Sequence, residues 1–214
     1  MSEARLLAAA SPAGLAFVCG HDYELPEHVR WINEELTKLA YSRGVRLGVF
    51  MPPRHGKSEL ISKWLPAWYL GNFPTRNVMV ITYAETLACD WTRHARDVLV
   101  EHGHIFGVSV RGGYNAKQAG WQTSAGGYCW AFGVGGPIAG RGADLMILDD
   151  LVKNAEEADS ELVRDKTWEW LETVAFTRLE PGASLVLVMT RWHDDDVAGR
   201  LEERDGFDRL RRTA

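Results

Sequence analysis

The stretch RLGVFMPPRHGKSEL at residues 46–60 decides the fold. Its apolar start predicts a short strand, the prolines and glycine that follow predict a turn, and a helical pattern begins at Ser58. A phosphate-binding turn needs inward-facing backbone N–H groups, a lysine that reaches the β- and γ-phosphates, and a hydroxyl for Mg²⁺. Gly56, Lys57 and Ser58 fit these needs, and Ser58 opens a helix whose positive end would face the phosphates.

The match to the usual phosphate-loop pattern is imperfect. That pattern begins with a glycine, and this chain has Met51 in its place. The alternative is an ordinary turn followed by a helix-capping serine, which needs no ligand. The place of the segment between a predicted strand and a predicted helix favours the phosphate loop.

Apolar runs alternate with helical patterns along the rest of the chain. Strands are predicted at 46–50, 77–83, 145–148 and 184–189, helices at 58–70, 85–101, 160–179 and 197–204, and a hairpin at 121–123 and 128–134. Uniformly apolar strands separated by helices predict one α/β domain, with a mostly parallel central sheet flanked by helices.

Two of these helices carry sharper expectations. Pro66 should break or kink the helix at 58–70, because proline cannot donate to the preceding turn. Ser160 should cap the helix at 160–179. The apolar side of this helix should be formed by Leu162, Val163, Trp170, Leu171 and Val174.

The composition excludes several classes of protein. A net charge of −5 over 214 residues argues against a domain that binds nucleic acid through bulk positive charge. No apolar run approaches the roughly 20 residues that span a bilayer. The three cysteines, Cys19, Cys89 and Cys129, are too far apart for a disulfide framework or a metal knuckle, and they suit a reducing cytosol.

A second candidate site lies where the predicted strand at 145–148 ends, at Asp149 and Asp150. The carboxyl ends of parallel strands meet at one edge of a sheet, so these acids should face the phosphate loop. In nucleotide hydrolases one such carboxylate orders the Mg²⁺ water shell and the next polarises the attacking water. The alternative is that the two acids only cap a turn or a helix.

The segment VMTRWH at 188–193 is a third candidate. A polar group at this strand end, here Thr190, could sense the γ-phosphate and transmit hydrolysis to a moving element. The acidic triplet at 194–196 could instead join Asp149 and Asp150 in a two-metal nuclease site. We prefer the simpler interpretation, in which the triplet caps the next helix and stays solvated.

Arg141 lies in a glycine-rich connection, AGRG at 139–142. Glycines leave the backbone exposed and adaptable, so an arginine there can extend toward a phosphate held by a neighbouring subunit. An ordinary surface arginine is an equally good interpretation.

Taken together, these segments resemble the ATPase domain of the tailed-phage large terminase, the motor that packages DNA. The resemblance rests on LPEHVRWINEEL at 25–36, RLGVFMPPRHGKSEL at 46–60, GRGADLMILDDLVKNAEEADS at 140–160 and LVMTRWHDDDVAGRL at 187–201. It implies a P-loop NTPase fold of the additional-strand, catalytic-glutamate type. It also implies Mg²⁺-dependent ATP hydrolysis that powers translocation of double-stranded viral DNA into a procapsid.

The resemblance assigns a nucleotide site. Lys57 and Ser58 would be the phosphate and Mg²⁺ groups, and Arg54 would lie near the γ-phosphate. Residues 1–45 would form an extension on the adenine side, around Pro26. The nucleotide contacts implied in this way are those of His28, Pro53, Arg54, His55, Gly56, Lys57, Ser58 and Glu59.

The resemblance leaves the catalytic base open. Asp149 would be the Mg²⁺-associated acid. Asp150 falls where most relatives carry the catalytic glutamate, so the group that polarises water could be Asp150, Glu156 or Glu157.

The family also implies coupling residues and partners. Thr190 would begin the coupling motif, and Arg141 would enter the site of the next subunit. The implied partners are double-stranded DNA, the portal protein and the small terminase subunit. We expect a homo-oligomeric ring on the portal, a monomer in isolation, and the host cytoplasm as location, without a membrane.

Large terminases usually continue into a nuclease domain of RNase H type. We expect that domain to be absent from residues 1–214, so that this chain is a single motor domain and does not cut DNA. Two alternatives to the motor stay open. One is a non-catalytic, nucleotide-binding assembly module, and the other is a different P-loop DNA translocase or helicase-like ATPase, which usually needs two motor domains.

Overall fold

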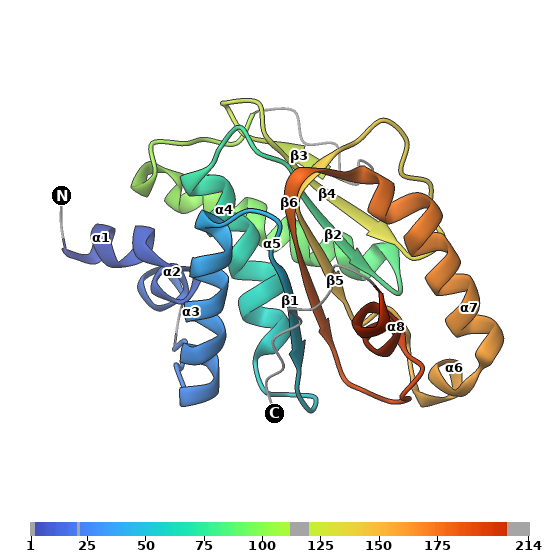
Figure 1. Ribbon diagram of the computed structural model, residues 1–214. Helices are drawn as coiled ribbons and strands as arrows, with labels where there is room; N and C mark the ends of the chain where they lie inside the picture. Colours follow the sequence, from blue (N-terminus) through green and yellow to red (C-terminus); the bar gives the residue numbers. More distant parts are fainter. Residues whose placement is uncertain (1–2, 21, 112–119, 205–214) are drawn as a thin grey trace.

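The computed structural model describes residues 3–20, 22–111 and 120–204 (Figure 1). These residues form a six-stranded sheet with helices packed against both faces. Three helices precede the first strand: α1 (Glu3–Ala10), α2 (Pro12–Cys19) and α3 (Glu27–Tyr41). The predicted α/β class is therefore confirmed.

The sheet is mostly parallel, as predicted. Its strands are β1 (Arg46–Phe50), β2 (Val78–Thr82), β3 (Gly120–Gln122), β4 (Tyr128–Gly133), β5 (Ala143–Asp149) and β6 (Leu179–Met189). Their order across the sheet is β1-β6-β5-β2-β4-β3. Among the strand pairs of the described residues, β3–β4 alone is antiparallel, which confirms the predicted hairpin.

Two strands are longer than the sequence pattern predicts. β5 extends beyond 145–148 at both ends, and β6 begins five residues before the predicted 184. The pairing of Ala143 with Leu179 shows the reason, because the backbone ladder continues past the fully apolar part of each strand. The hydrophobic pattern marks only the part of a strand that is buried on both faces.

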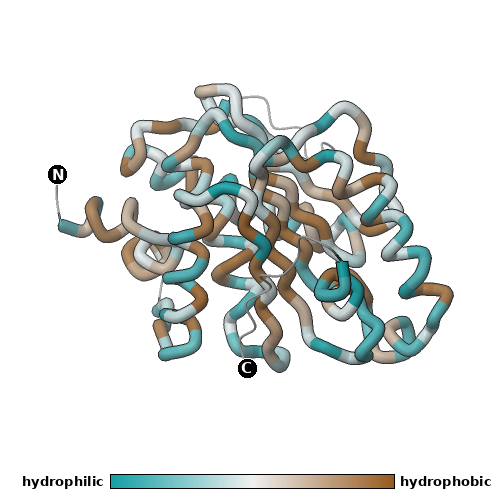
Figure 2. Tube along the Cα trace, viewed as in Figure 1, coloured by the Kyte–Doolittle hydropathy of each residue, from teal (hydrophilic) through white to brown (hydrophobic). Residues whose placement is uncertain are grey.

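Each face of the sheet packs on its own set of helices. Val78 and Val80 of β2 pack with α3, α4 (Leu65–Asn72) and α5 (Glu85–His102). Met79 and Ile81, which alternate with them, pack with α8 (Val197–Glu203) and the segment that follows α7 (Glu161–Trp170). Figure 2 shows hydrophobic colour along the central strands, whereas hydrophobic and hydrophilic colours alternate along the outer helices.

The helix after the predicted phosphate loop is not broken at Pro66. It begins at residue 57, passes through the π-helical segment η1 (Glu59–Trp64) and continues as α4. Pro66 lies at the second position of α4, and the N–H group of Leu65 just before it bonds the carbonyl of Leu60, five residues back. The widened turn accommodates a residue that has no N–H group and would crowd an α-helical turn.

The expectations for the helix at 160–179 are confirmed in part, since Leu171 is buried and Trp170 and Val174 pack on the same core cluster. Ser160 is its N-cap residue but makes no side-chain cap bond. The α-helix ends at Trp170, and a π-helical segment η3 (Leu171–Ala175) and a 3₁₀ turn η4 (Phe176–Arg178) follow. Leu162 is 62% exposed rather than packed. A short helix, α6 (Ala155–Asp159), directly precedes Ser160, so that Ser160 ends one helix and begins the next.

Two further findings concern membrane-spanning helices and the cysteines. Within residues 3–20, 22–111 and 120–204, no helix has the length and apolar character needed to cross a membrane. The three cysteines are free thiols, and Cys129 is buried in β4.

Candidate functional site

The three segments singled out from the sequence meet at one edge of the sheet. β1, β6 and β5 are adjacent and parallel, so their carboxyl ends lie side by side (Figure 1). Phe50 at the end of β1 pairs with Met189, and Asp149 at the end of β5 pairs with Val188. The loop after β1, the acids of β5 and Thr190 after β6 are thus brought together, although Ser58 at the end of the loop and Asp149 are 91 residues apart in the sequence.

The loop between β1 and the helix has an unusual backbone. Arg54 and Gly56 both have positive φ angles, of 66° and 74°. Glycine adopts this region freely, whereas an arginine does so at a cost. The exposed ring of His55 contacts the loop's own backbone, since its Nδ1 lies 2.9 Å from the carbonyl oxygen of Pro53 and 3.2 Å from that of Pro52.

The backbone amides of this loop are available to a ligand. Among the described residues, none accepts a hydrogen bond from the N–H groups of Arg54 and Gly56. The loop leads directly into the N-terminus of the helix that begins at Lys57. Free amides and a helix N-terminus together favour an anion at this place.

Asp149 is held by two hydroxyl groups of that helix. Ser58 Oγ donates to Asp149 Oδ1 at 2.9 Å, and Ser62 Oγ donates to Asp149 Oδ2 at 2.6 Å. Asp149 is 2% exposed, so its carboxylate is almost completely withdrawn from water. The neighbourhood of Ser58 and Asp149 therefore offers hard oxygen donors, which are the ligands that Mg²⁺ prefers.

Burial raises the pKa of Asp149 to about 6, and the nearby Asp150 carboxylate adds to this rise. The hydrogen bonds from Ser62 and Ser58 and the charge of Lys57 oppose it but do not cancel it. Withdrawal from water penalises a charge that hydroxyl groups solvate only in part. The site thus carries a buried negative charge that is incompletely compensated.

Lys57 lies between the two other strand ends. Its Nζ is 3.9 Å from Asp150 Oδ2 and 3.4 Å from Thr190 Oγ1. Thr190 also donates its hydroxyl to the carbonyl of Met51 at 3.3 Å, and its backbone N–H to Asp150 Oδ1 at 3.3 Å. Lysine, aspartate and threonine therefore form one connected network at the edge of the sheet.

Asp150 differs from its neighbour in exposure and backbone. Its φ angle is 45°, in the left-handed region that is strained for a residue other than glycine. Its side chain is 41% exposed, against almost complete burial for Asp149. The turn after β5 therefore points the second carboxylate outward, where a water molecule or a ligand can reach it.

A cleft of about 560 Å³ lies beside the loop, on the side of the N-terminal helices. One wall comes from the segment 22–29 and the other from the segment 54–59. His28 contributes to the first wall, and its Nε2 lies 3.1 Å from the carbonyl oxygen of His55. The two regions assigned to the nucleotide by resemblance thus face each other across a cleft of a size usual for small-molecule sites.

The two glutamates offered as alternative bases, Glu156 and Glu157, lie in the first turn of α6. Glu157 is part of the N-terminal cap of α6: its N–H donates to Asn154 Oδ1, and its Oε2 accepts from the N–H of Lys153, both at 2.9 Å. Glu156 is exposed on the same helix. No hydrogen bond or ion pair among the described residues joins either glutamate to the loop. Their catalytic role stays a prediction, and Asp150 is the acid that the fold brings to Lys57.

The acidic triplet after β6 is bound by arginines. Asp196 caps α8 through the N–H of Gly199 at 3.0 Å, as predicted, but it is buried and pairs with Arg191 at 2.6 Å. Asp195 accepts from Arg200 at 2.7 Å and from Arg164 at 3.2 Å. The expectation that the triplet stays solvated is therefore wrong for Asp196, whereas the side chain of Asp195 is 46% exposed and stays solvated as predicted. In the part of the chain that the structure describes, no group of three or more acids, histidines or cysteines could hold a metal, which gives the two-metal nuclease no support.

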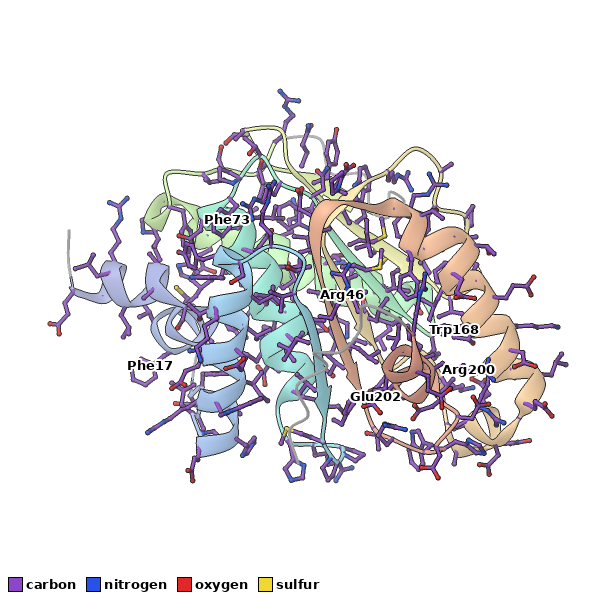
Figure 3. All side chains as sticks on the ribbon, in the orientation of Figure 1. Phe17, Arg46, Phe73, Trp168, Arg200 and Glu202 are labelled. Atoms are coloured by element: carbon purple, nitrogen blue, oxygen red, sulfur yellow. The ribbon has the colours of Figure 1, made fainter. Side chains whose placement is uncertain are left out.

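The arginines of this region tie two helices together. Arg200 of α8 reaches Asp165 of α7 at 2.7 Å as well as Asp195. Figure 3 shows Arg200 on the side of α8 that faces α7. The hydrogen bonds from Arg200 and Arg164 lower the pKa of Asp195 to about 2. The charge of Asp195 is thus compensated within the fold.

Arg141 lies at the opposite edge of the sheet from the loop. It precedes β5 by two residues, and its guanidinium carbon is 4.4 Å from the ring centroid of Trp130 and 5.4 Å from that of Phe132. It does not contribute to the network around Lys57 in the same chain. Its role in a neighbouring subunit stays a prediction.

Ser62 is the site residue that the sequence interpretation missed. One signal could have found it, because a residue four positions after Ser58 lies on the same side of a helix. The hydroxyl at 62 would have been a candidate partner for whatever Ser58 contacts.

Comparison with known proteins identifies the family. The family model described as terminase large subunit, T4likevirus-type, N-terminal, matches residues 49–208. The match includes the loop, both acids of β5, Thr190 and the triplet that follows it. A search of curated proteins gave no match. The chain belongs to the family of T4-like-virus-type terminase large subunits, of which it contains the N-terminal domain.

Proposed function

We propose that this domain is a Mg²⁺-dependent ATPase of the P-loop type, which powers translocation of double-stranded viral DNA into a procapsid. Membership of the terminase large subunit family implies a role in DNA packaging. One observation carries the ATPase proposal: Lys57 and Ser58 at a helix N-terminus lie against Asp150 and Asp149 at the end of a neighbouring strand. These are the groups that nucleoside triphosphate hydrolysis requires.

The order of the strands supports the proposed P-loop type. β6 lies between β1, which leads into the loop, and β5, which carries the acids. An extra strand between these two is what the additional-strand class requires. The three strand ends then supply a phosphate loop, a pair of acids and a sensing residue to one edge.

The cleft beside the loop is the proposed place of the nucleoside. Its wall from residues 22–29 includes Pro26 and His28, which would lie against adenine. Arg54 and Glu59 line the opposite wall, nearer the phosphates. We therefore propose residues 1–214 as one motor domain, with residues 1–45 as its adenine-side extension.

The donor set at Ser58 and Asp149 fits Mg²⁺. Both offer oxygen ligands or partners for metal-bound water, and the buried charge of Asp149 is incompletely compensated. When bound, Mg²⁺ would neutralise charge on the β- and γ-phosphate oxygens. Ser58 would hold it directly, and Asp149 would orient Ser58 and the water around it.

The remaining residues would act on the phosphates and the attacking water. Lys57 and the free amides of the loop would bind the phosphate oxygens, and Arg54 would approach the γ-phosphate. Asp150 is the proposed base, because its exposed carboxylate lies beside Lys57. Thr190 contacts both Lys57 and Asp150, so a change at the γ-phosphate would reach the segment after β6 through it.

Assembly completes the proposed motor. A homo-oligomeric ring on the portal protein, supplied with DNA through the small terminase subunit, would let Arg141 of one subunit reach the site of the next. Arginines supplied in trans accelerate such reactions by on the order of 10³–10⁵-fold. The isolated chain would then hydrolyse ATP slowly. Full activity would require the assembled ring, in the host cytoplasm.

A steady-state ATPase assay over a range of protein concentrations tests the proposal. We expect Mg²⁺-dependent turnover per chain that rises with concentration, no turnover for Lys57→Ala, and unchanged turnover for Lys38→Ala, an exposed lysine of α3. Arg141→Ala should abolish the rise with concentration and spare nucleotide binding. Undiminished turnover in Lys57→Ala would reject the site.

One observation favours a second candidate, a non-catalytic assembly module that uses ATP only to dock. The residue after Asp149 is an aspartate, one methylene shorter than the glutamate usual at this place. The same assay separates the two candidates. Nucleotide binding without turnover at any protein concentration would favour the module.

A further inference from the structure

The carboxylate of Asp149 is anchored at both of its oxygens by one helix. Ser58 donates to Oδ1 at 2.9 Å, and Ser62 donates to Oδ2 at 2.6 Å. The shorter of the two bonds is the one to Ser62, which is completely buried, whereas Ser58 is partly exposed. The two serines therefore differ in what else can reach them.

We propose that Ser62 is a positioning residue for the metal site: it locks the orientation of the Asp149 carboxylate and thereby sets the affinity of the site for Mg²⁺. This inference rests on the proposed ATPase function. The two oxygens of Asp149 then have separate roles. Oδ1 accepts from Ser58, which faces the metal, and Oδ2 accepts from the buried Ser62, which fixes the orientation of the carboxylate.

The burial of the pair explains why the anchor matters. A carboxylate turns readily about its last bond, and water usually satisfies any oxygen that the protein leaves free. Asp149 is 2% exposed, so water cannot replace a lost donor at Oδ2. Without the Ser62 hydroxyl, the carboxylate would turn to share Ser58 between its two oxygens.

The helix keeps both serines on the side of β5. Ser58 begins the helix, and Ser62 lies four residues later within η1, where the turns are widened ahead of Pro66. Ser62 makes its bond to a residue 87 positions away, and the bond is fully buried. π-helical turns are rare, and they occur frequently at functional sites.

Groups around a metal that do not touch it commonly determine its affinity. Replacing such a partner typically costs about 10–100-fold in metal affinity or activity. We expect Ser62→Ala to weaken Mg²⁺ binding by about tenfold. The affinity for nucleotide in the absence of Mg²⁺ should not change, because Ser62 is out of reach of the cleft.

The test measures binding rather than turnover. A fluorescent ATP analogue is titrated into the full chain in EDTA and at increasing Mg²⁺, for the wild type, Ser62→Ala and Ser62→Thr. Ser184→Ala is the matched control, since it also removes a buried serine hydroxyl, one that accepts from the N–H of Val45 at the far edge of the sheet. Melting temperatures are recorded for all four proteins.

The expected result is a Mg²⁺ midpoint raised about tenfold in Ser62→Ala, near the wild-type value in Ser62→Thr, and unchanged in Ser184→Ala. A wild-type midpoint in Ser62→Ala would overturn the inference and leave the proposed function standing. Equal weakening with and without Mg²⁺ would also overturn it, since it would show a loss of fold. A wild-type chain that binds no nucleotide in either condition would overturn both proposals.

Discussion

Two acidic segments follow neighbouring strands of the sheet, and they look alike in the sequence. Asp149 and Asp150 follow β5, and the triplet at 194–196 follows β6. In the first segment, hydroxyl groups hold the buried carboxylate of Asp149, and its pKa rises to about 6. In the second, two arginines hold the half-exposed carboxylate of Asp195, and its pKa falls to about 2.

The difference lies in the partners. A hydroxyl group satisfies an acceptor without cancelling its charge, so the first segment retains a negative charge that a bound cation can compensate. A guanidinium group cancels the charge it bonds, so the second segment is already neutralised and joins helices. The four predictions below test this contrast, from the largest expected effect to the smallest.

The largest effect is expected at Asp150, compared with Glu157, an acid already engaged in a helix cap. Asp150→Asn should lower ATP turnover by on the order of 10³-fold, as removal of a general base does. Glu157→Gln should lower turnover by less than about threefold, since an amide oxygen can still cap α6. Single-turnover kinetics with Mg²⁺ and ATP measure both. A larger loss in Glu157→Gln than in Asp150→Asn would reverse the assignment of the base.

The second prediction compares the two segments directly. Asp149→Asn should lower turnover by about 100-fold through weaker Mg²⁺ binding, and excess Mg²⁺ should restore part of it. Asp195→Asn should leave turnover within about threefold of the wild type, because the surface pair it weakens contributes little. The measurement is turnover over a range of Mg²⁺ concentrations. Similar losses in both variants would refute the contrast.

The third prediction concerns pH and stability without metal. A pKa raised in the folded state means that the fold binds the proton of Asp149 more tightly than the unfolded chain does between about pH 4 and 6. Ionisation of Asp149 therefore lowers the free energy of unfolding as pH rises through this window. Asp149→Asn should stabilise the chain by about 2 kcal/mol at pH 7.5 and give no gain at pH 4.

Urea unfolding in EDTA at the two pH values measures this gain. Asp195→Asn is the control, and its effect on the unfolding free energy at pH 7.5 should have the opposite sign. Its depressed pKa stabilises the fold above about pH 4, and that contribution is lost as pH falls toward 2. Destabilisation by Asp149→Asn at pH 7.5 would contradict the prediction.

The smallest effect is expected at the ion pairs between α7 and α8. Arg200→Ala removes the bonds to Asp195 and Asp165, both of which are half exposed, and should cost about 1 kcal/mol of unfolding free energy. The loss should shrink in 1 M NaCl, because salt screens exposed charges. Arg93→Ala, which breaks one exposed pair within α5, should cost less. If Arg200→Ala and Arg93→Ala lost the same unfolding free energy at low and at high salt, the ion pairs of Arg200 would contribute no more than a single exposed pair.

Local patterns predicted much of the site. The loop at 51–58, the acids after β5 and Thr190 after β6 were all found because each follows a short apolar run. Parallel pairing then brings such strand ends to one edge whatever the detailed packing. The placement of Pro26 and His28 beside the loop was predicted from the resemblance alone. Both residues line the same cleft as the loop, in agreement with that prediction.

Other features depended on packing between distant segments. The sequence pattern did not separate Glu157 from Asp150 as a possible base, and only the cap of α6 shows that Glu157 has other partners. The sequence pattern also did not predict that Asp195 pairs with Arg164, which lies 31 residues away along the chain. Acids end many strands and helices, and their role depends on the cations that other elements bring to them.

The sequence by itself determined the α/β architecture, the family, and the identity of the lysine, serine and acids at the sheet edge. These follow from periodicity and from short-range order, which a linear pattern records. The tertiary structure alone decided which carboxylate is held by hydroxyls and which by arginines, and it revealed Ser62. Those outcomes depend on side chains 31 and 87 positions apart meeting at hydrogen-bond distance, which the packing of helices on the sheet fixes and no local pattern contains.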